Sequence, residues 1–252
     1  MTRILFLRFP FVFWLLLQLA SPVEAITYPQ LALGDGYEAV ILINNQTERE
    51  WQGTGQLLQR AGQPWATAWK VDGAQAGANA SFEIKLSGRS TAKLILKGNS
   101  QLQVGYLKIL PREGFSRQGV NVSFFYNLVA GGPVLESTGV SGGQAAKRFA
   151  FGVEKSPLIN TGLAWAPYET LSGFQISASL LDDSGNQLQQ QSLSFQGHLS
   201  RFFSEIFEDV PENFLGTVVI DSPEPFLLVV LRLETAPAGF QLTSLPHSSS
   251  RT

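Results

Sequence analysis

Two short strings in the chain match patterns that hydrolytic enzymes use. Gly139–Gly143 has the Gly-x-Ser-x-Gly form of a nucleophile elbow, and Ser90–Lys93 has the Ser-x-x-Lys form of penicillin-binding enzymes. The elbow joins a strand to a helix and needs a later Asp and His, whereas Ser-x-x-Lys works with Lys-Thr-Gly and Ser-Asp-Asn strings. No helix start follows Ser141, and the companion strings are absent from the sequence. We therefore interpret both matches as accidental and predict a protein that is not an enzyme.

Few side chains in the sequence could bind a metal ion. The chain has two histidines and no cysteine, and a zinc site requires three or four His, Cys or carboxylate ligands. The segment Asp182–Asn186 could supply oxygen ligands to calcium, but Gly185 comes too early for an EF-hand loop, which has glycine at its sixth position. We interpret this segment as a hairpin turn and expect neither a metal nor a cofactor.

Three tryptophans are the strongest candidates for ligand binding. Trp51 lies in a predicted turn, Trp65 precedes the small-residue stretch Thr67–Ala80, which is predicted to be a long loop, and Trp69 lies near the start of this stretch. Flat aromatic faces can stack on sugar rings or fill a pocket of a partner, and tryptophan is enriched at binding hot spots. The alternative for Trp65, which aligns with Leu188 in an internal repeat, is a place in the core.

Two polar residues in the second half are predicted to have structural roles. His198 stands where a helix is predicted to begin, and a polar side chain there can cap free backbone N–H groups. Arg232 follows the apolar run Phe226–Leu231, and an arginine in such a place usually pairs with a carboxylate or exposes its charged end. Glu205 is the partner that we expect for Arg232.

The first 25 residues have the composition of a signal peptide. Two arginines precede or enter an apolar run that reaches Ala20, and Val23 and Ala25 stand at positions −3 and −1 of a small-residue cleavage site. A membrane anchor is the alternative, but the apolar run is shorter than the ~20 residues that a spanning helix needs. We expect cleavage after Ala25, export to the periplasm or the extracellular space, and no membrane span in the mature chain.

The composition of the chain excludes several classes of protein. Its 18 basic and 20 acidic residues include no basic cluster of the kind that marks a nucleic-acid-binding surface. The absence of cysteine excludes a small disulfide scaffold and an acylated lipoprotein. Three Asn-x-Ser/Thr sequons, at Asn45, Asn79 and Asn121, matter only in a host that glycosylates its exported proteins.

Alternation of apolar and polar residues predicts β-strands along the chain. Ser81–Leu86 and Phe174–Leu181 alternate with a period of two, which is the pattern of a half-buried strand. Phe226–Leu231 is apolar on both faces and is expected to be central in its sheet. Turn signals separate about six or seven short strands per ~100 residues, which is typical of a β-sandwich.

Part of this pattern occurs twice in the sequence. The matching pairs are Leu57 with Leu180, Gly62 with Gly185, Phe82 with Leu193, and Gly105 with Gly216. The offset between matching residues falls from 123 to 111 within Thr67–Ala80. We interpret this change as a difference in loop length, because loops tolerate insertions and strands do not. We predict two tandem β-sandwich (immunoglobulin-like) domains, residues 26–149 and 150–246, followed by a disordered tail at 247–252.

One segment of the second predicted domain has the period of a helix. The apolar residues of His198–Glu208 recur at i, i+3, i+4, i+7 and i+8: Leu199, Phe202, Phe203, Ile206 and Phe207. We predict a short amphipathic helix whose phenylalanines plug one end of the sandwich. A membrane-binding helix is the alternative, but its polar face would carry Lys or Arg, and this one carries Glu205 and Glu208.

The second half contains a series of motifs in a fixed order: Asp182–Gly185 (D-x-x-G), Gly197–Phe207 (G-H-x-x-x-F-x-x-E-x-F), Gly216–Ile220 and Leu231-Arg232. Together they resemble a repeated β-sandwich module of uncharacterised exported bacterial proteins, and the first half resembles the module that usually precedes it. The chain departs from that group at Ala166-Pro167, where the group has Asn-Pro, and at Val218, where it has Leu. The resemblance implies a fold and an exported location, and no catalytic residue.

These observations favour an exported, non-catalytic interaction or adhesion module that binds a cell-envelope protein or polysaccharide. This function predicts an exposed aromatic or apolar patch, or an open sheet edge, near Thr67–Ala80. A purely structural spacer is the alternative, and it predicts no concave pocket and no exposed tryptophan. A hydrolase is less favoured, since it would need a cleft with two carboxylates ~5–9 Å apart.

Overall fold

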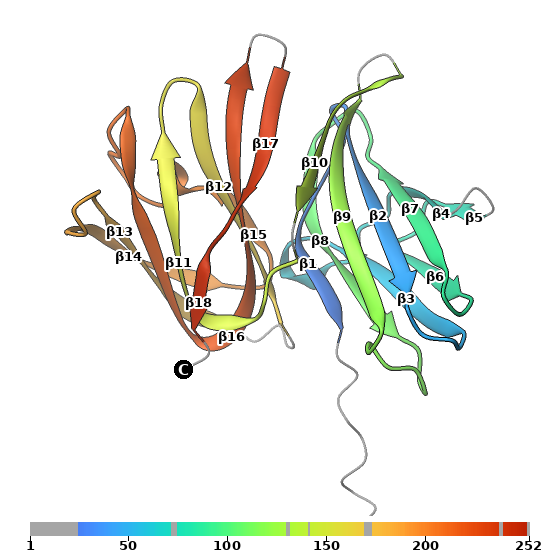
Figure 1. Ribbon diagram of the computed structural model, residues 1–252. Coiled ribbons are helices and arrows are strands. Elements are labelled where there is room, and N and C mark those ends of the chain that lie inside the picture. The colour runs from blue at the N-terminus through green and yellow to red at the C-terminus, as the bar shows by residue number, and fades with distance from the viewer. Residues whose placement is uncertain are drawn as a thin grey trace, which may run out of the picture.

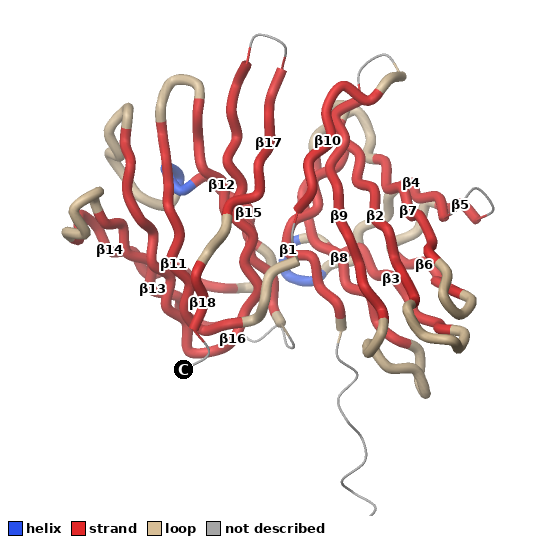
Figure 2. Tube along the Cα trace, in the orientation of Figure 1, coloured by secondary structure: helices blue, strands red, loops and turns tan. Residues whose placement is uncertain are grey.

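The computed structural model describes residues 25–71, 75–129, 132–140, 142–168, 173–236 and 239–250. The predicted signal peptide, residues 1–25, lies outside the described residues except for Ala25. The prediction of an all-β fold is confirmed: the helical segments described are single turns, Arg60–Gly62 and Phe203–Glu205 (Figure 2). None of the described helices is long and apolar enough to span a membrane.

The strands form two units that lie side by side, β1–β10 and β11–β18 (Figure 1). The first unit has two sheets. One has the order β1 (Ile26–Leu33), β8 (Gln103–Pro111), β3 (Trp51–Leu58), β6 (Ser81–Leu86). The other has the order β10 (Val134–Val140), β9 (Val120–Val129), β2 (Tyr37–Asn45), β7 (Thr91–Lys97), β4 (Ala68–Val71), β5 (Gln75–Gly77). Buried residues of both sheets form one apolar core, because alternate side chains of each strand point inward.

The second unit is built around one long strand, β16 (Phe214–Ala236). Its other strands are β11 (Ala146–Lys155), β12 (Ile159–Pro167), β13 (Phe174–Leu181), β14 (Gln187–Phe195), β15 (Leu199–Phe202), β17 (Gly239–Leu245) and β18 (Ser248–Ser250). The first part of β16 pairs with β11 and β13, and the part from Phe226 onward pairs with β12 and β17. All residues of Phe226–Leu231 are buried, so the prediction of a central strand is confirmed.

The strands of the predicted sequence repeat have corresponding neighbours in the two units. β3 pairs with β6 and β8, and β13 pairs in the same way with β14 and β16. Leu57 lies opposite Leu107, and Leu180 lies opposite Val218. These pairs are related by the same two offsets, 123 and 111 residues, that relate the two halves of the sequence.

The helix predicted over His198–Glu208 is wrong. Its first part is the strand β15, which pairs with β12, and only one helical turn follows, closed by N–H groups of Ile206 and Phe207 that donate to the Phe203 carbonyl at 3.0 Å. Phe203 and Phe207 are buried in the second core as predicted, whereas Phe202 is only half-buried. The free edge of β12 offers backbone hydrogen bonds to this segment, and this tertiary pairing outweighs the helical period.

The predicted boundaries of the second unit also need correction. β11 begins at Ala146, so the predicted junction between residues 149 and 150 falls inside a strand. The predicted disordered tail contains β18, whose residues Ser248 and Ser250 lie opposite Ala150 and Arg148 of β11. Hydrogen bonding of the backbone to the edge of β11 orders this polar segment, although its side chains have little apolar surface to bury.

The two units pack against each other along β1. This strand is at the edge of its own sheet, yet seven of its eight residues are buried, because β12 and β16 contact it from the second unit. Val229 and Leu231 of β16 belong to the core of the first unit. The Thr138 hydroxyl of β10 donates to the Leu242 carbonyl of β17 at 2.6 Å. The interface therefore contains both apolar packing and hydrogen bonds.

Candidate functional site

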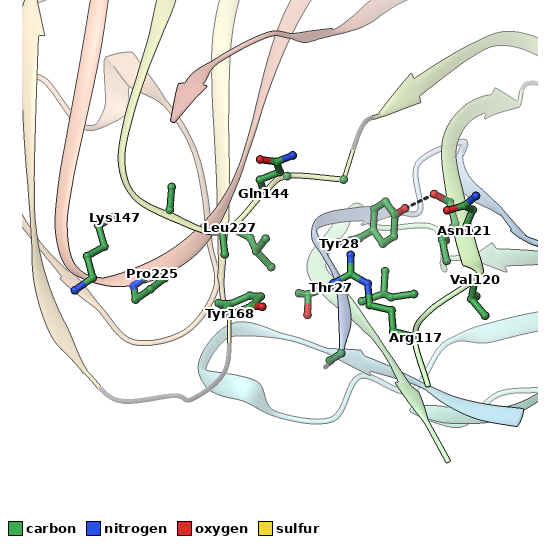
Figure 3. A pocket seen from close by; sticks show the side chains of 17 residues that line it. Thr27, Tyr28, Arg117, Val120, Asn121, Gln144, Lys147, Tyr168, Pro225 and Leu227 are labelled. Atoms are coloured by element: carbon green, nitrogen blue, oxygen red, sulfur yellow. Dashed lines mark hydrogen bonds between the residues drawn. The ribbon is translucent and has the colours of Figure 1, made fainter. Parts of the chain in front are cut away.

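A cavity of about 770 Å³ lies between the two units (Figure 3). Its walls come from the start of β1, the start of β9, the linker that joins the units, the end of β12 and the bend of β16. The polar side chains that line it are Thr27, Arg117, Asn121, Gln144, Lys147 and Tyr168. Because both units contribute to these walls, their packing against each other creates the cavity.

The linker forms one wall because it runs close to β16. A Cβ atom on Gly143 would lie 2.5 Å from the Leu228 carbonyl oxygen, a distance that no side chain can adopt. On Gly142, a Cβ atom would lie 3.4 Å from the ring of Tyr28. These two glycines belong to the string that matches a nucleophile elbow. In the structure they allow the backbone of the linker to pass close to the residues of both units.

Tyr28 forms a rigid inner wall of the cavity. Its ring stacks on Phe124 with the centroids 5.3 Å apart, and its hydroxyl donates to the Val122 carbonyl at 2.6 Å. Burial raises the pKa of Tyr28 to about 12, and the positive charge of Arg117 opposes this rise. The phenol therefore stays protonated at ordinary pH and acts as a neutral surface rather than as an acid or base.

The charged groups in the cavity wall have one sign. Arg117 comes from the first unit and Lys147 from the second, and Figure 3 shows them at opposite ends with Tyr168 between them. No Asp or Glu is found among the described residues that line the cavity. A hollow with positive groups and no carboxylate attracts negatively charged ligands. The carboxylate pair that a glycoside-hydrolysing cleft needs is not found among these described lining residues.

The structure buries the three tryptophans that were expected to bind ligand. Trp51 and Trp65 are each 3% exposed and Trp69 is 7% exposed. The indole N–H of Trp51 donates to the Ser116 carbonyl, and that of Trp65 donates to Gln103 Oε1, both at 2.9 Å. The expectation of exposed rings is wrong, and the alternative that Trp65 belongs to the core is confirmed.

The predicted loop Thr67–Ala80 contains two strands. β4 and β5 are the last two strands at one end of the six-stranded sheet. The ring of Trp69 on β4 packs against that of Phe82 across the core, with the ring centroids 5.4 Å apart. β5 has one neighbour in the sheet and is thus an open edge, as the interaction hypothesis predicts for this region. The strand has only three residues, however, and short edge strands are poor templates for pairing.

His198 lies at the interface of the units and caps no helix, which corrects its predicted role. It is 4% exposed, and its ring stacks on Tyr106 with the centroids 5.7 Å apart. Burial lowers the pKa of His198 to about 4, a hydrogen bond to the Pro29 backbone opposes this, and the positive charge of Arg60 adds to the lowering. His198 is neutral at pH 7 and does not line the cavity.

Arg232 pairs with two carboxylates, and neither is the expected Glu205. Its Nε lies 3.0 Å from Glu154 Oε2, and its Nη1 lies 2.6 Å from Glu234 Oε2. Arg232 lies opposite Thr161 of β12, whose hydroxyl donates to the Glu154 carbonyl at 3.1 Å, and Glu234 is two residues from Arg232 on the same face of β16. The prediction of carboxylate pairing is confirmed, and the choice of partner is corrected.

The turn Asp182–Asn186 uses its oxygen atoms internally. Asp182 Oδ1 accepts the backbone N–H groups of Ser184 at 3.0 Å and Asn186 at 2.8 Å, and its Oδ2 accepts from the Asn186 side chain at 3.0 Å. These hydrogen bonds lower the pKa of Asp182. Across the described part of the chain, no group of three or more His, Cys, Asp or Glu side chains could hold a metal ion.

A second hollow of about 330 Å³ also lies between the units, and it is mostly apolar. Leu102, Val104, Leu231, Leu233 and Leu242 contribute to its walls. Ligand sites combine a concave surface with several polar groups that fix orientation. Both hollows have polar side chains in their walls, and the larger cavity, whose polar groups are less outweighed by apolar surface, is the better candidate.

The residues of the candidate site were not found from the sequence. Arg117, Lys147 and Tyr168 stand in no recognisable motif, and Asn121 is marked only as part of a sequon. They come together because the linker, β9 and β12 meet at the interface. The paired glycines at 142–143 are the one local signal of a close backbone approach there.

No protein-family model and no curated protein matches the chain. Among solved structures, it is similar to procruciferin, the 11S globulin from Brassica napus, at 8% identity over 86% of this chain and 77% of that one, with a TM-score of 0.24. It is also similar to the coconut allergen cocosin at 10% identity, over 88% and 79% of the two chains, with a TM-score of 0.25. Likeness this weak carries no functional argument, so the site rests on its own geometry.

Proposed function

We propose that this protein is an exported, non-catalytic interaction module that holds a cell-envelope polysaccharide in the cavity between its two units; an envelope protein is the alternative partner. The cavity itself carries the proposal. Its volume of about 770 Å³ is within the range of known ligand sites, and polar side chains from both units line it. A site of this kind needs no catalytic group, because affinity comes from hydrogen bonds and charge.

The cavity also bears on the rival functions. A structural spacer predicts no concave pocket and no exposed tryptophan: the cavity speaks against it, whereas the burial of the three candidate tryptophans agrees with it. A hydrolase requires two facing carboxylates, and none is found among the described lining residues. The composition of residues 1–25 supports export. The equivalent pairings around β3 and β13 support the further proposal that the units are tandem, duplicated immunoglobulin-like sandwiches.

The test begins with the full chain, expressed with its own N-terminal segment in a bacterial host. Recovery from the exported fraction with Ile26 as the first residue supports export and cleavage. The purified protein is then screened against envelope polysaccharides and envelope protein fractions, beside Lys147→Ala and a matched control, Lys70→Ala, which removes an exposed charge on β4. We expect binding that Lys147→Ala weakens and Lys70→Ala leaves unchanged. Absence of binding to every envelope polymer would refute the proposal.

A further inference from the structure

The two cations of the cavity differ in their surroundings. Lys147 forms no ion pair with any described residue, although its neighbour Arg148 pairs with Asp221 at 2.9 Å. Lys147 is one of the residues that line the cavity, and it lies at a register shift of β11 between Ala146 and Arg148. A partly buried ammonium group that forms no ion pair gains stability when an anion binds beside it.

Arg117 supplies the second positive group, at the other end of the cavity (Figure 3). It precedes β9, and it lies near enough to Tyr28 for its charge to act on the phenol. A guanidinium group presents a planar fork of N–H donors that matches a carboxylate or a phosphate. Two separated cations fit a ligand that carries anionic groups at two points along its length.

Between the cations, the wall offers neutral hydrogen-bonding groups. Asn121 and Gln144 provide amides, which can both donate to and accept from hydroxyl groups. Tyr168 lines the middle of the cavity, where an aromatic side chain can lie against the face of a sugar ring. The apolar side chains of Val120 and Leu227 complete the surface. This mixture suits a chain of hydroxyl-bearing rings better than an aliphatic chain.

We infer that the cavity binds an acidic saccharide segment, with its carboxylate or phosphate groups held by Arg117 and Lys147 and its hydroxyl groups held by Asn121 and Gln144. The inference rests on the proposed function, that an envelope polysaccharide occupies this cavity, and it specifies the chemical class of that polysaccharide. The contact with both units means that the ligand bridges them.

The experiment compares two ligands that differ only in charge. Calorimetric titration of the exported protein uses an oligogalacturonate and the same oligosaccharide with its carboxylates methyl-esterified. We expect binding of the acid form and a loss of about tenfold or more on esterification, since charge-assisted hydrogen bonds are stronger than neutral ones. Lys147→Ala and Arg117→Ala should each weaken binding of the acid form, Lys147→Arg should restore part of it, and Lys70→Ala should have no effect.

A further variant, Asn121→Trp, places a bulky ring in the part of the wall that should hold the hydroxyl groups, without changing the charge, and should weaken binding, with its fold checked by circular dichroism. Equal affinity for the esterified and acid forms would overturn the inference while leaving the proposed function intact. So would inorganic phosphate binding as tightly as the oligosaccharide, because one anion site would then suffice. Acid-form binding that Asn121→Trp leaves unchanged would place the ligand elsewhere and overturn both.

Discussion

Asn45 has a structural role that its sequence motif does not predict. It is the acceptor position of a sequon, yet it is fully buried at the end of β2. Its Nδ2 donates to the carbonyls of Arg49 at 2.7 Å and Ser87 at 3.0 Å, and its Oδ1 accepts from the N–H of Thr47 at 3.1 Å and the hydroxyl of Thr47 at 2.8 Å. All four hydrogen-bonding positions of the amide are thus used to fix the turn.

Substitution of Asn45 by Asp should therefore destabilise the protein. The new carboxylate oxygen would face the two carbonyl groups to which Nδ2 now donates, and a buried group left unsatisfied costs about 1–3 kcal/mol or more when charged. We expect a lower free energy of unfolding in urea. Asn79→Asp, at an exposed sequon, is the control and should change little. Equal stability of the two variants would contradict the structural role of Asn45.

The buried tryptophans lead to a prediction about stability rather than binding. Trp69→Ala should lower the free energy of unfolding by about 3–5 kcal/mol, because it leaves a large cavity beside Phe82. Trp69→Phe should cost much less, since Trp69 Nε1 has no hydrogen-bond partner among the described residues. Chemical denaturation measures both. A Trp69→Phe variant that kept its stability but lost its polysaccharide binding would show that Trp69 contributes to binding after all.

At the scale of elements, backbone pairing at strand edges decides several assignments. β18 pairs along three residues of β11, and the ring of His247 lies 5.3 Å from that of Phe149. β15 pairs in the same way along β12. Both segments lack the alternation of a typical strand, and their strand character comes from the edges that they meet.

Removal of the residues after Pro246 should expose the edge of β11. We expect a loss of about 1–3 kcal/mol in stability, from the lost hydrogen bonds and the packing of His247. Amide hydrogen exchange in Arg148–Ala150 should become faster. A chain that lacks only residues 251–252 serves as the comparison. Unchanged exchange in β11 after the longer deletion would show that β18 does not protect this edge.

At the scale of the whole molecule, the two units depend on each other. β1 lies between them, and side chains of β16 complete the core of the first unit. His198 of the second unit stacks on Tyr106 of the first, and both are buried. Protonation of His198 would place a positive charge at this contact. The interactions found for His198 include no carboxylate that could neutralise the charge, and Arg60 would repel it.

The stability of the molecule should therefore depend on the protonation of His198. Its pKa is about 4 in the folded chain and about 6.5 when unfolded, so between these values the unfolded state binds a proton that the folded state does not. Stability should fall as the pH drops from about 6.5 to about 4, by at most about 3 kcal/mol. His198→Phe, which retains a stacked ring, should reduce the slope of Tm against pH between 5 and 7. A slope identical to that of the unaltered protein would assign the pH dependence to other groups.

The sequence by itself determined the all-β class, the strand Ser81–Leu86 with its bounds, the central position of Phe226–Leu231 and the turn at Asp182–Asn186. Each of these is local, because side-chain alternation and turn residues act over a few positions of the chain. The burial of Phe203 and Phe207 could also be predicted, since both the helical period and the observed single turn direct them inward.

Only the tertiary structure decided the exposure of the tryptophans, the strands β15 and β18, and the cavity. Trp69 is buried because β4 joins a sheet whose other strands come from distant parts of the sequence. The cavity unites residues from Thr27 to Leu227, which meet only when the two units pack along β1. Periodicity specifies which way a side chain faces within its own strand. The partner at a free edge, and the space left between two packed units, depend on contacts between residues far apart in the chain.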